Sequence, residues 1–167
     1  MSTALPERLD LARLADLNAV LDGTLPLAGF ARLAALLADR EGSVEAHLEF
    51  SRHGGRELIR GAVRAELRLV CQRCMAPVAV AVVAPLALAR VATESEAAEL
   101  ADGLDPVVAP TREVASSALL EDELLLAVPL VPRHERDEDC DPAALRTIAA
   151  AQAESHPFAA LAALKKN

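Results

Sequence analysis

Three consecutive stretches decide the fold: VEAHLEF at residues 44–50, Gly54-Gly55, and RELIRGAVRAELRLV at residues 56–70. Apolar and polar residues alternate in the first and third stretches, which is the period of a strand with one buried face. Two glycines between strands favour a tight two-residue turn, because they adopt positive φ without strain. These stretches therefore predict an antiparallel hairpin.

One register of this hairpin satisfies both of its faces. It sets apolar residues opposite apolar residues and acidic residues opposite arginines. The pairs are Phe50 with Ile59, Ala46 with Val63, Glu49 with Arg60, and Glu45 with Arg64. A slip of one residue would place arginines opposite core side chains, so the pattern specifies the register strongly.

The segments before and after the hairpin predict two helices and a third strand. Leucine and alanine recur at helical intervals in residues 9–21 and 25–37, so two short N-terminal helices are expected. Residues 78–90 are rich in Val, Leu and Ala and predict a strand, bent or at an edge of the sheet because of Pro85.

A leucine-rich helix is expected over residues 112–128, with Thr111 as its N-cap and Pro129 as its stop. Its leucines point to more than one side. The helix is therefore either sandwiched inside the fold or offers a face to a partner, and burial is the more common outcome for apolar residues.

Together these elements predict one α+β domain over residues 1–167. Its core would be a small antiparallel β meander or partly open barrel, with the N-terminal helices and the leucine-rich helix packed on it. Residues 92–110 predict an acidic flap that ends in an extended piece at Val107-Val108. Residues 141–167 form an Ala-rich tail, whose end predicts an amphipathic helix docked through Phe158, Leu161 and Leu164.

Composition limits the classes of function. The formal net charge of −8 opposes a general attraction to nucleic acid, so any RNA contact would be local. With no Trp or Tyr and three Phe, the chain lacks the aromatic platforms that stack bases. No apolar run reaches the roughly 18 residues of a membrane span. The odd cysteine count and the acidic N-terminal segment favour a soluble protein of the reducing cytoplasm.

Four residues have the composition of a zinc site. Cys71 and Cys74 have a spacing that can hold one metal ion from a single turn, and His134 and Cys140 lie in a polar loop far along the chain. Together they would make a Cys3His set for tetrahedral zinc. Three other interpretations remain open. The first is a dithiol redox pair, which is disfavoured because the motif follows a strand and does not start a helix. In the second, Cys71 is a small buried hydrophobe and Cys74 a turn residue, and in the third, His134 is a surface histidine.

A row of arginines is the one concentrated positive feature of the chain. Its members are Arg56, Arg60, Arg64 and Arg68, with Arg73 beyond them. On a strand they would repeat at about 13 Å along one face and could follow a nucleic-acid backbone. The alternative is a solvated face that nearby glutamates partly neutralise, which is the usual outcome for such a row.

The sequence offers no convincing active site. The acidic run Glu121, Asp122 and Glu123 is too contiguous to converge on one metal, because neighbours on a helix point about 100° apart. It predicts a solvated patch and a candidate partner-binding surface. No phosphate-binding loop, dinucleotide motif or nucleophile elbow is present.

Three blocks of this sequence resemble the YceD family of large ribosomal RNA subunit accumulation proteins. They are VCQRCMAPV at residues 70–78, LLEDELLLAVPLVPRH at residues 119–134 with Cys140 soon after, and HPFAALAALKK at residues 156–166. The matching positions are Cys71, Arg73, Cys74, Pro77, Glu121, Asp122, Glu123, Leu125, Leu126, Pro129, Pro132, His134, Cys140, Pro157, Phe158 and Leu161. The chain departs at His156, where the family often has Asn.

The resemblance implies a non-enzymatic factor needed for synthesis, processing or stability of 23S rRNA during large-subunit assembly. The implied partners are 23S rRNA or its precursor, large-subunit ribosomal proteins, or both. No DNA, membrane or small-molecule partner is expected. Two alternatives are a thiol-dependent oxidoreductase that uses the Cys71-Cys74 pair, and a protein-binding adaptor for basic ribosomal proteins, which the acidic balance of the chain suits.

Overall fold

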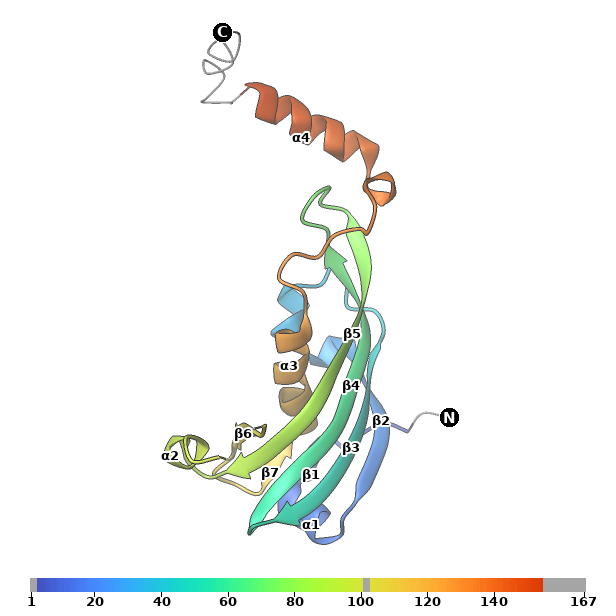
Figure 1. Cartoon of the computed structure of the whole chain (residues 1–167). Helices are drawn as coiled ribbons and strands as arrows, with labels where there is room; N and C mark the ends of the chain where they lie inside the picture. The colour runs from blue at the N-terminus through green and yellow to red at the C-terminus, as the bar shows by residue number, and fades with distance from the viewer. Residues whose placement is uncertain (1–2, 101–102, 155–167) are drawn as a thin grey trace. The chain divides into compact units, whose positions relative to one another are not determined.

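The computed structural model describes residues 3–100 and 103–154 (Figure 1). They divide into two compact units. The first unit takes Met1–Leu69 and Ala79–Leu130, and the second takes Val70–Val78 and Val131–Asn167. The α+β class is confirmed, with a five-stranded sheet and a separate two-stranded sheet.

The five-stranded sheet has the order β2-β3-β4-β5-β6 (Figure 1). Its strands are β2 (Val20–Pro26), β3 (Ser43–His53), β4 (Arg56–Val70), β5 (Pro77–Val91) and β6 (Asp105–Val108). Strands β3, β4 and β5 form the predicted meander, β2 adds a further antiparallel strand beside β3, and β6 runs parallel to β5. Over the described residues the sheet stays open and forms no closed barrel, since β2 and β6 end its order.

The predicted hairpin of β3 and β4 is confirmed together with its register. Four residue pairs were expected, and all four face each other in the structure. These are Phe50 with Ile59, Ala46 with Val63, Glu49 with Arg60, and Glu45 with Arg64. Gly54 and Gly55 have φ values of 57° and 80°, as a tight turn between twisted strands requires.

The third predicted strand is also confirmed, as β5. Pro85 lies where it was expected to be tolerated, because β6 pairs only with the last four residues of β5, Leu88 to Val91. At Pro85 the strand has β4 as its neighbour on one side and does not pair with β6 on the other. Proline has no backbone N–H to donate, and it is tolerated where no neighbouring strand requires that N–H.

The prediction of two N-terminal helices is largely wrong. The first is reduced to α1 (Leu11–Asp16), preceded by β1 (Arg8–Asp10). In place of the second helix the chain forms β2 and two 3-10 turns, η1 (Leu27–Gly29) and η2 (Leu33–Ala35). Every residue of β2 pairs with β3, so backbone hydrogen bonds to a neighbouring strand override the helical spacing of the leucines.

The leucine-rich helix is α3 (Ser116–Ala127), which is shorter than predicted. Residues 113–115 form β7 (Glu113–Ala115) and pair with β1, so the helix cannot start at Thr111. Its N-cap is Ala115, which makes no side-chain capping bond. The predicted stop is correct: Val128, the residue before Pro129, has an extended backbone with ψ of 130°.

One side of α3 is buried and the other is open to solvent. Leu119, Leu120 and Leu124 belong to the core, whereas Leu126 is 83% exposed. The helix is therefore not sandwiched on all sides. Figure 1 shows it beside the sheet, and its contacts include η2 and β7.

Glu121 is a buried acceptor that ties α3 to the turn η2. Its carboxylate accepts hydrogen bonds from the backbone N–H of Arg32 and Leu33 at 2.7 Å and 2.9 Å, and from Nε of Arg32 at 3.0 Å. Burial alone would raise the pKa of Glu121. The N–H of Leu33 and the Arg32 guanidinium outweigh it and hold the pKa below its ordinary value.

The acidic flap is more structured than predicted. It contains the short helix α2 (Glu94–Ala97), capped by Thr93, and the strand β6, which includes the expected extended piece at Val107-Val108. In the second unit, η3 (Asp137–Asp139) precedes α4 (Pro142–Glu154), which forms the first part of the Ala-rich tail. The predicted docking helix with Phe158, Leu161 and Leu164 lies outside the described residues.

Among the helices that the structure describes, none has the length and apolar character needed to cross a membrane.

Gly61 is required where β4 passes β3. Its φ is 141°, and a Cβ at this position would collide with the carbonyl oxygen of His47. Gly61→Ala is therefore expected to lower the free energy of unfolding by about 3 kcal/mol, measured by urea denaturation. Gly29→Ala is the matched control because a Cβ there meets nothing within 4 Å. Equal stability of the two variants would contradict the steric argument.

The buried carboxylate of Glu121 predicts a pH-dependent contribution to stability. Because its pKa is lowered in the folded state, the contribution is complete above the ordinary value of 4.5 and is lost as the pH falls through the folded pKa. Glu121→Gln should lower the free energy of unfolding at pH 7 by about 1–3 kcal/mol.

The difference between wild type and Glu121→Gln should shrink as the pH falls below 4.5, which urea titrations at several pH values would measure. Glu66→Gln, at an exposed position on β4, is the control. A stability difference that does not change with pH would mean that the shape of the side chain matters and its charge does not.

Candidate metal centre

A tight corner between β4 and β5 positions the first two ligands. The backbone N–H of Met75 donates to the carbonyl of Cys71 at 2.9 Å, and the N–H of Cys71 donates to the carbonyl of Ala76 at 2.9 Å. Met75 has a φ of 62°, a left-handed conformation that allows the chain to reverse here. Cys71 and Cys74 are both buried.

The second pair of ligands comes from the segment after α3. The backbone N–H of Gln72 donates to the carbonyl of Pro132 at 2.8 Å, which joins this segment to the corner within the second unit. The turn η3 then closes with a bond from the N–H of Cys140 to the carbonyl of Asp137 at 3.1 Å. Arg73 forms an ion pair with Asp137 and adds a further link.

All four predicted ligands converge. The ligand atoms of Cys71, Cys74, His134 and Cys140 lie within 4.8 Å of one another. Nδ1 of His134 is 3.6 Å from Sγ of Cys74 and 3.6 Å from Sγ of Cys140. With zinc bonds of about 2.3 Å to sulfur and about 2.0 Å to nitrogen, a tetrahedral site requires S···N separations of about 3.6 Å. The cluster therefore fits a tetrahedral metal ion.

The electrostatics of the corner favour thiolate at the first two cysteines. Burial raises the pKa of Cys71, but hydrogen bonds from the backbone N–H of Cys74 and Arg73 outweigh it and bring the pKa to about 5. Burial also acts on Cys74, where the N–H groups of Ala76 and Asp141 lower the pKa below its usual range. Thiolate is the form that binds metal, so these N–H groups prepare the ligands.

The thiols of Cys71 and Cys74 raise the pKa values of the other two candidate ligands, Cys140 and His134. Burial raises the pKa of Cys140, and the thiols of Cys74 and Cys71 raise it further. The pKa of His134 is raised chiefly by its hydrogen bond with Cys71. Both shifts favour the protonated forms, so a divalent cation bound here would have to displace a proton from each of these ligands, and its charge would then stabilise the ionised thiols.

The four arginines of β4 lie in the first unit, separate from Arg73. Two of them have acidic partners: Arg68 pairs with Asp39 at 2.9 Å, and Arg56 is 3.9 Å from Glu96. Among the described residues, Arg60 and Arg64 make no ion pair within 4.0 Å. These two are the members of the row that are available to a partner.

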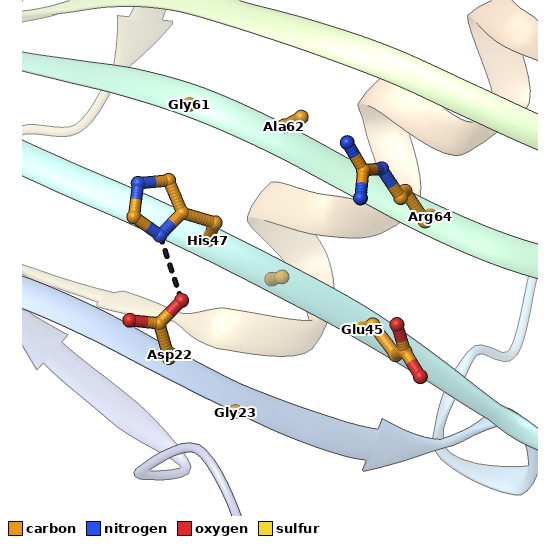
Figure 2. A pocket seen from close by; sticks show the side chains of 8 residues that line it. Asp22, Gly23, Glu45, His47, Gly61, Ala62 and Arg64 are labelled. Atoms are coloured by element: carbon orange, nitrogen blue, oxygen red, sulfur yellow. Dashed lines mark hydrogen bonds and ion pairs between the residues drawn. The ribbon is translucent and has the colours of Figure 1, made fainter. Parts of the chain in front are cut away.

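Figure 2 shows a shallow pit of about 530 Å³ on the polar face of the sheet, with Arg64 and Glu45 on one side and His47 and Asp22 on the other. Nδ1 of His47 is 2.7 Å from the Asp22 carboxylate, and this bond is the main reason that the pKa of His47 is raised. Sequence analysis missed this pair, because it forms only when β2 lies beside β3. The residues that line the pit provide no hydroxyl or thiol nucleophile.

The acidic run of α3 does not form one solvated patch. Glu121 is buried, as described above, so this part of the prediction is wrong. Asp122 is exposed and pairs with Arg32 at 2.7 Å. Glu123 is half-buried, and burial, followed by the charges of Asp105 and Asp122, raises its pKa. Successive helical positions point in different directions, so the three carboxylates meet three environments.

Comparison with known proteins identifies the family of the chain. A family model described as large ribosomal RNA subunit accumulation protein YceD matches residues 59–165, a region that contains all four candidate ligands. A protein of the same name from Haemophilus influenzae is 31% identical over 115 residues. That match covers 65% of this chain and 66% of the relative, slightly less than two thirds of its length. No solved structure matches the chain significantly. The chain therefore belongs to the YceD family of large ribosomal RNA subunit accumulation proteins.

Proposed function

We propose that this protein is a non-enzymatic factor of the cytoplasm that the cell needs to accumulate 23S rRNA and large ribosomal subunits. The observation that carries the proposal is membership of the YceD family. The role is that which the name of the Haemophilus influenzae relative states. The protein acts by binding pre-ribosomal RNA or ribosomal proteins during assembly of the large subunit.

In this proposal the Cys71, Cys74, His134 and Cys140 cluster holds one zinc ion with a structural task. Four protein ligands fill a tetrahedral shell and leave no position for water or substrate, which is typical of structural zinc. The ion would join the corner between β4 and β5 to the segment that follows α3 within the second unit. It would supply no chemistry beyond stabilising that arrangement.

For RNA contact we propose Arg60 and Arg64, with Arg56, Arg68 and Arg73 as weaker contributors. The absence of intramolecular ion pairs for the first two among the described residues supports this order, because a paired guanidinium must give up its partner before it binds phosphate. The contact would be local, as the net charge of −8 requires.

The main alternative is a thiol-dependent enzyme that uses Cys71 and Cys74. The low pKa of Cys71, about 5, favours it. All three thiols are buried, however, whereas reactive cysteines are partly exposed to their substrates. The same low pKa is expected of a metal ligand, and the burial of the thiols supports the metal-ligand interpretation over the enzyme.

Elemental analysis of untagged, freshly purified protein should find about one zinc per chain. Cys74→Ser and His134→Ala should each reduce that content and lower the unfolding temperature, because either change opens the tetrahedral shell. His53→Ala, at an exposed position of the hairpin, is the matched control and should keep its zinc.

Two outcomes would contradict the zinc proposal. Reduced wild-type protein without metal would assign the four residues to packing alone. Rapid alkylation of Cys71 and Cys74 at neutral pH in protein that retains full stability would instead favour the thiol-dependent enzyme.

The RNA proposal is tested in a strain that lacks its own copy of the gene. Loss of the gene should lower the ratio of 23S to 16S rRNA, and wild-type protein should restore it. The double variant Arg60→Glu/Arg64→Glu should fail to restore the ratio. Its binding to large-subunit rRNA precursors should also show a slope of log K against log salt that is smaller by about two.

The double variant Arg13→Glu/Arg40→Glu is the matched control, because both residues are exposed and the change in net charge is the same. It should behave as wild type. If the β4 variant also restores the ratio and binds precursor normally, the arginine row has no part in the function. If loss of the gene leaves the ratio unchanged, the proposed function itself is wrong.

A further inference from the structure

A groove of about 670 Å³ lies between α3 and residues 105–115 in the first unit. It is the largest pocket described here, and its size is that of sites that bury a compact ligand or a few side chains of a peptide. Neither the candidate metal centre nor the arginine row contributes to it. The groove is therefore separate from both of the candidate sites already proposed.

The floor of the groove is apolar and partly open. Val107, Val114 and Leu119 line it, together with Val108 and Leu126. Val108 is 40% exposed and Leu126 is 83% exposed, so large aliphatic side chains face water on both walls. An apolar partner that covers both would remove this surface from water and gain binding free energy.

The rim of the groove is acidic throughout. It carries the carboxylates of Asp105, Glu113, Asp122 and Glu123, and none of its lining residues is Lys, Arg or His. Glu113 and Asp122 have internal partners, Arg8 at 2.9 Å and Arg32 at 2.7 Å.

In the part of the chain that the structure describes, Asp105 and Glu123 form no ion pair within 4.0 Å. Glu123 is also half-buried, and the neighbouring charges of Asp105 and Asp122 disfavour its ionised form. A cation placed between the carboxylates of Asp105 and Glu123 would reduce the repulsion between them.

We propose that this groove binds a basic amphipathic segment of a partner protein. Apolar side chains of the segment lie on Val108 and Leu126, and a lysine or arginine beside them pairs with Glu123 and Asp105. The inference rests on the proposed function, since it names the class of partner that assembly of a ribosomal subunit provides: proteins with basic, apolar-containing segments. RNA does not suit this site, because the carboxylates of Asp105 and Glu123, which have no ion pair among the described residues, would repel its phosphates.

The test is a binding measurement by fluorescence anisotropy with full-length protein and three labelled probes. The probes are an amphipathic Leu–Lys peptide of about four helical turns, its Leu–Glu counterpart, and single-stranded RNA. Only the Leu–Lys peptide is expected to bind in the groove, and any RNA bound at Arg60 and Arg64 should be unaffected by changes to the groove residues. Glu123→Lys should weaken that binding by about tenfold or more, and Leu126→Ser by about fivefold.

Matched controls separate the groove from general acidity and stickiness. Glu66→Lys makes the same change in net charge on the outer face of β4, and Leu17→Ser removes another exposed leucine, which lies just after α1. Both should keep the wild-type affinity within about twofold, the range expected for changes outside a binding site. Leu126 is exposed, so its substitution should leave the fold intact, which circular dichroism would verify.

Three outcomes would overturn the proposal. The Glu123→Lys and Glu66→Lys variants could bind the Leu–Lys peptide equally, which would reduce the effect to net charge. The Leu–Glu peptide could bind as well, which would leave only apolar adhesion. RNA could bind wild type and lose affinity in Leu126→Ser, which would assign the groove to nucleic acid. Each outcome is independent of the 23S to 16S rRNA ratio, so the groove can fail while the proposed function stands, or the reverse.

Discussion

The register between β3 and β4 is the constraint on which the rest of the structure depends. Side chains alternate along a strand, so the pairing of Phe50 with Ile59 also fixes the pairing of Glu49 with Arg60. One face of the hairpin then becomes core and the other becomes a polar surface. The other edge of β3 pairs with β2, which places Asp22 beside His47 and completes the residues around the pit of Figure 2.

The features that sequence could predict are those with a local physical cause. Alternation and Gly54-Gly55 predicted the hairpin because both signals act within a few residues. The β2 strand could not be predicted in the same way, because Leu21 and Leu25 fit the helical spacing of the segments 9–21 and 25–37, and only pairing with β3 selects the strand. The burial of Glu121 could not be predicted for a similar reason. A glutamate next to two other acidic residues is expected to be solvated, and only the fold brings the N–H groups of Arg32 and Leu33 to its carboxylate.

The candidate metal centre could be predicted from the sequence only in part. The ligand types and the close spacing of Cys71 and Cys74 were visible in the sequence, whereas the approach of His134, 60 residues after Cys74, depends on the tertiary fold. The bond from Gln72 to the carbonyl of Pro132 is the contact that settles the approach within the second unit. No pattern in the sequence indicates a backbone bond of this kind, so composition could suggest the site and only the structure could bring its halves together.

The second unit is the part of the chain whose stability the proposed metal ion would affect most. Among its residues with described burial, the buried ones are Cys71, Cys74, Val78 and Cys140. Three of these four are candidate ligands, so the usual source of stability, a cluster of large apolar side chains, is nearly absent there. In such a unit, binding of the proposed metal ion and folding would become one event, and the ligand cluster would serve as the core.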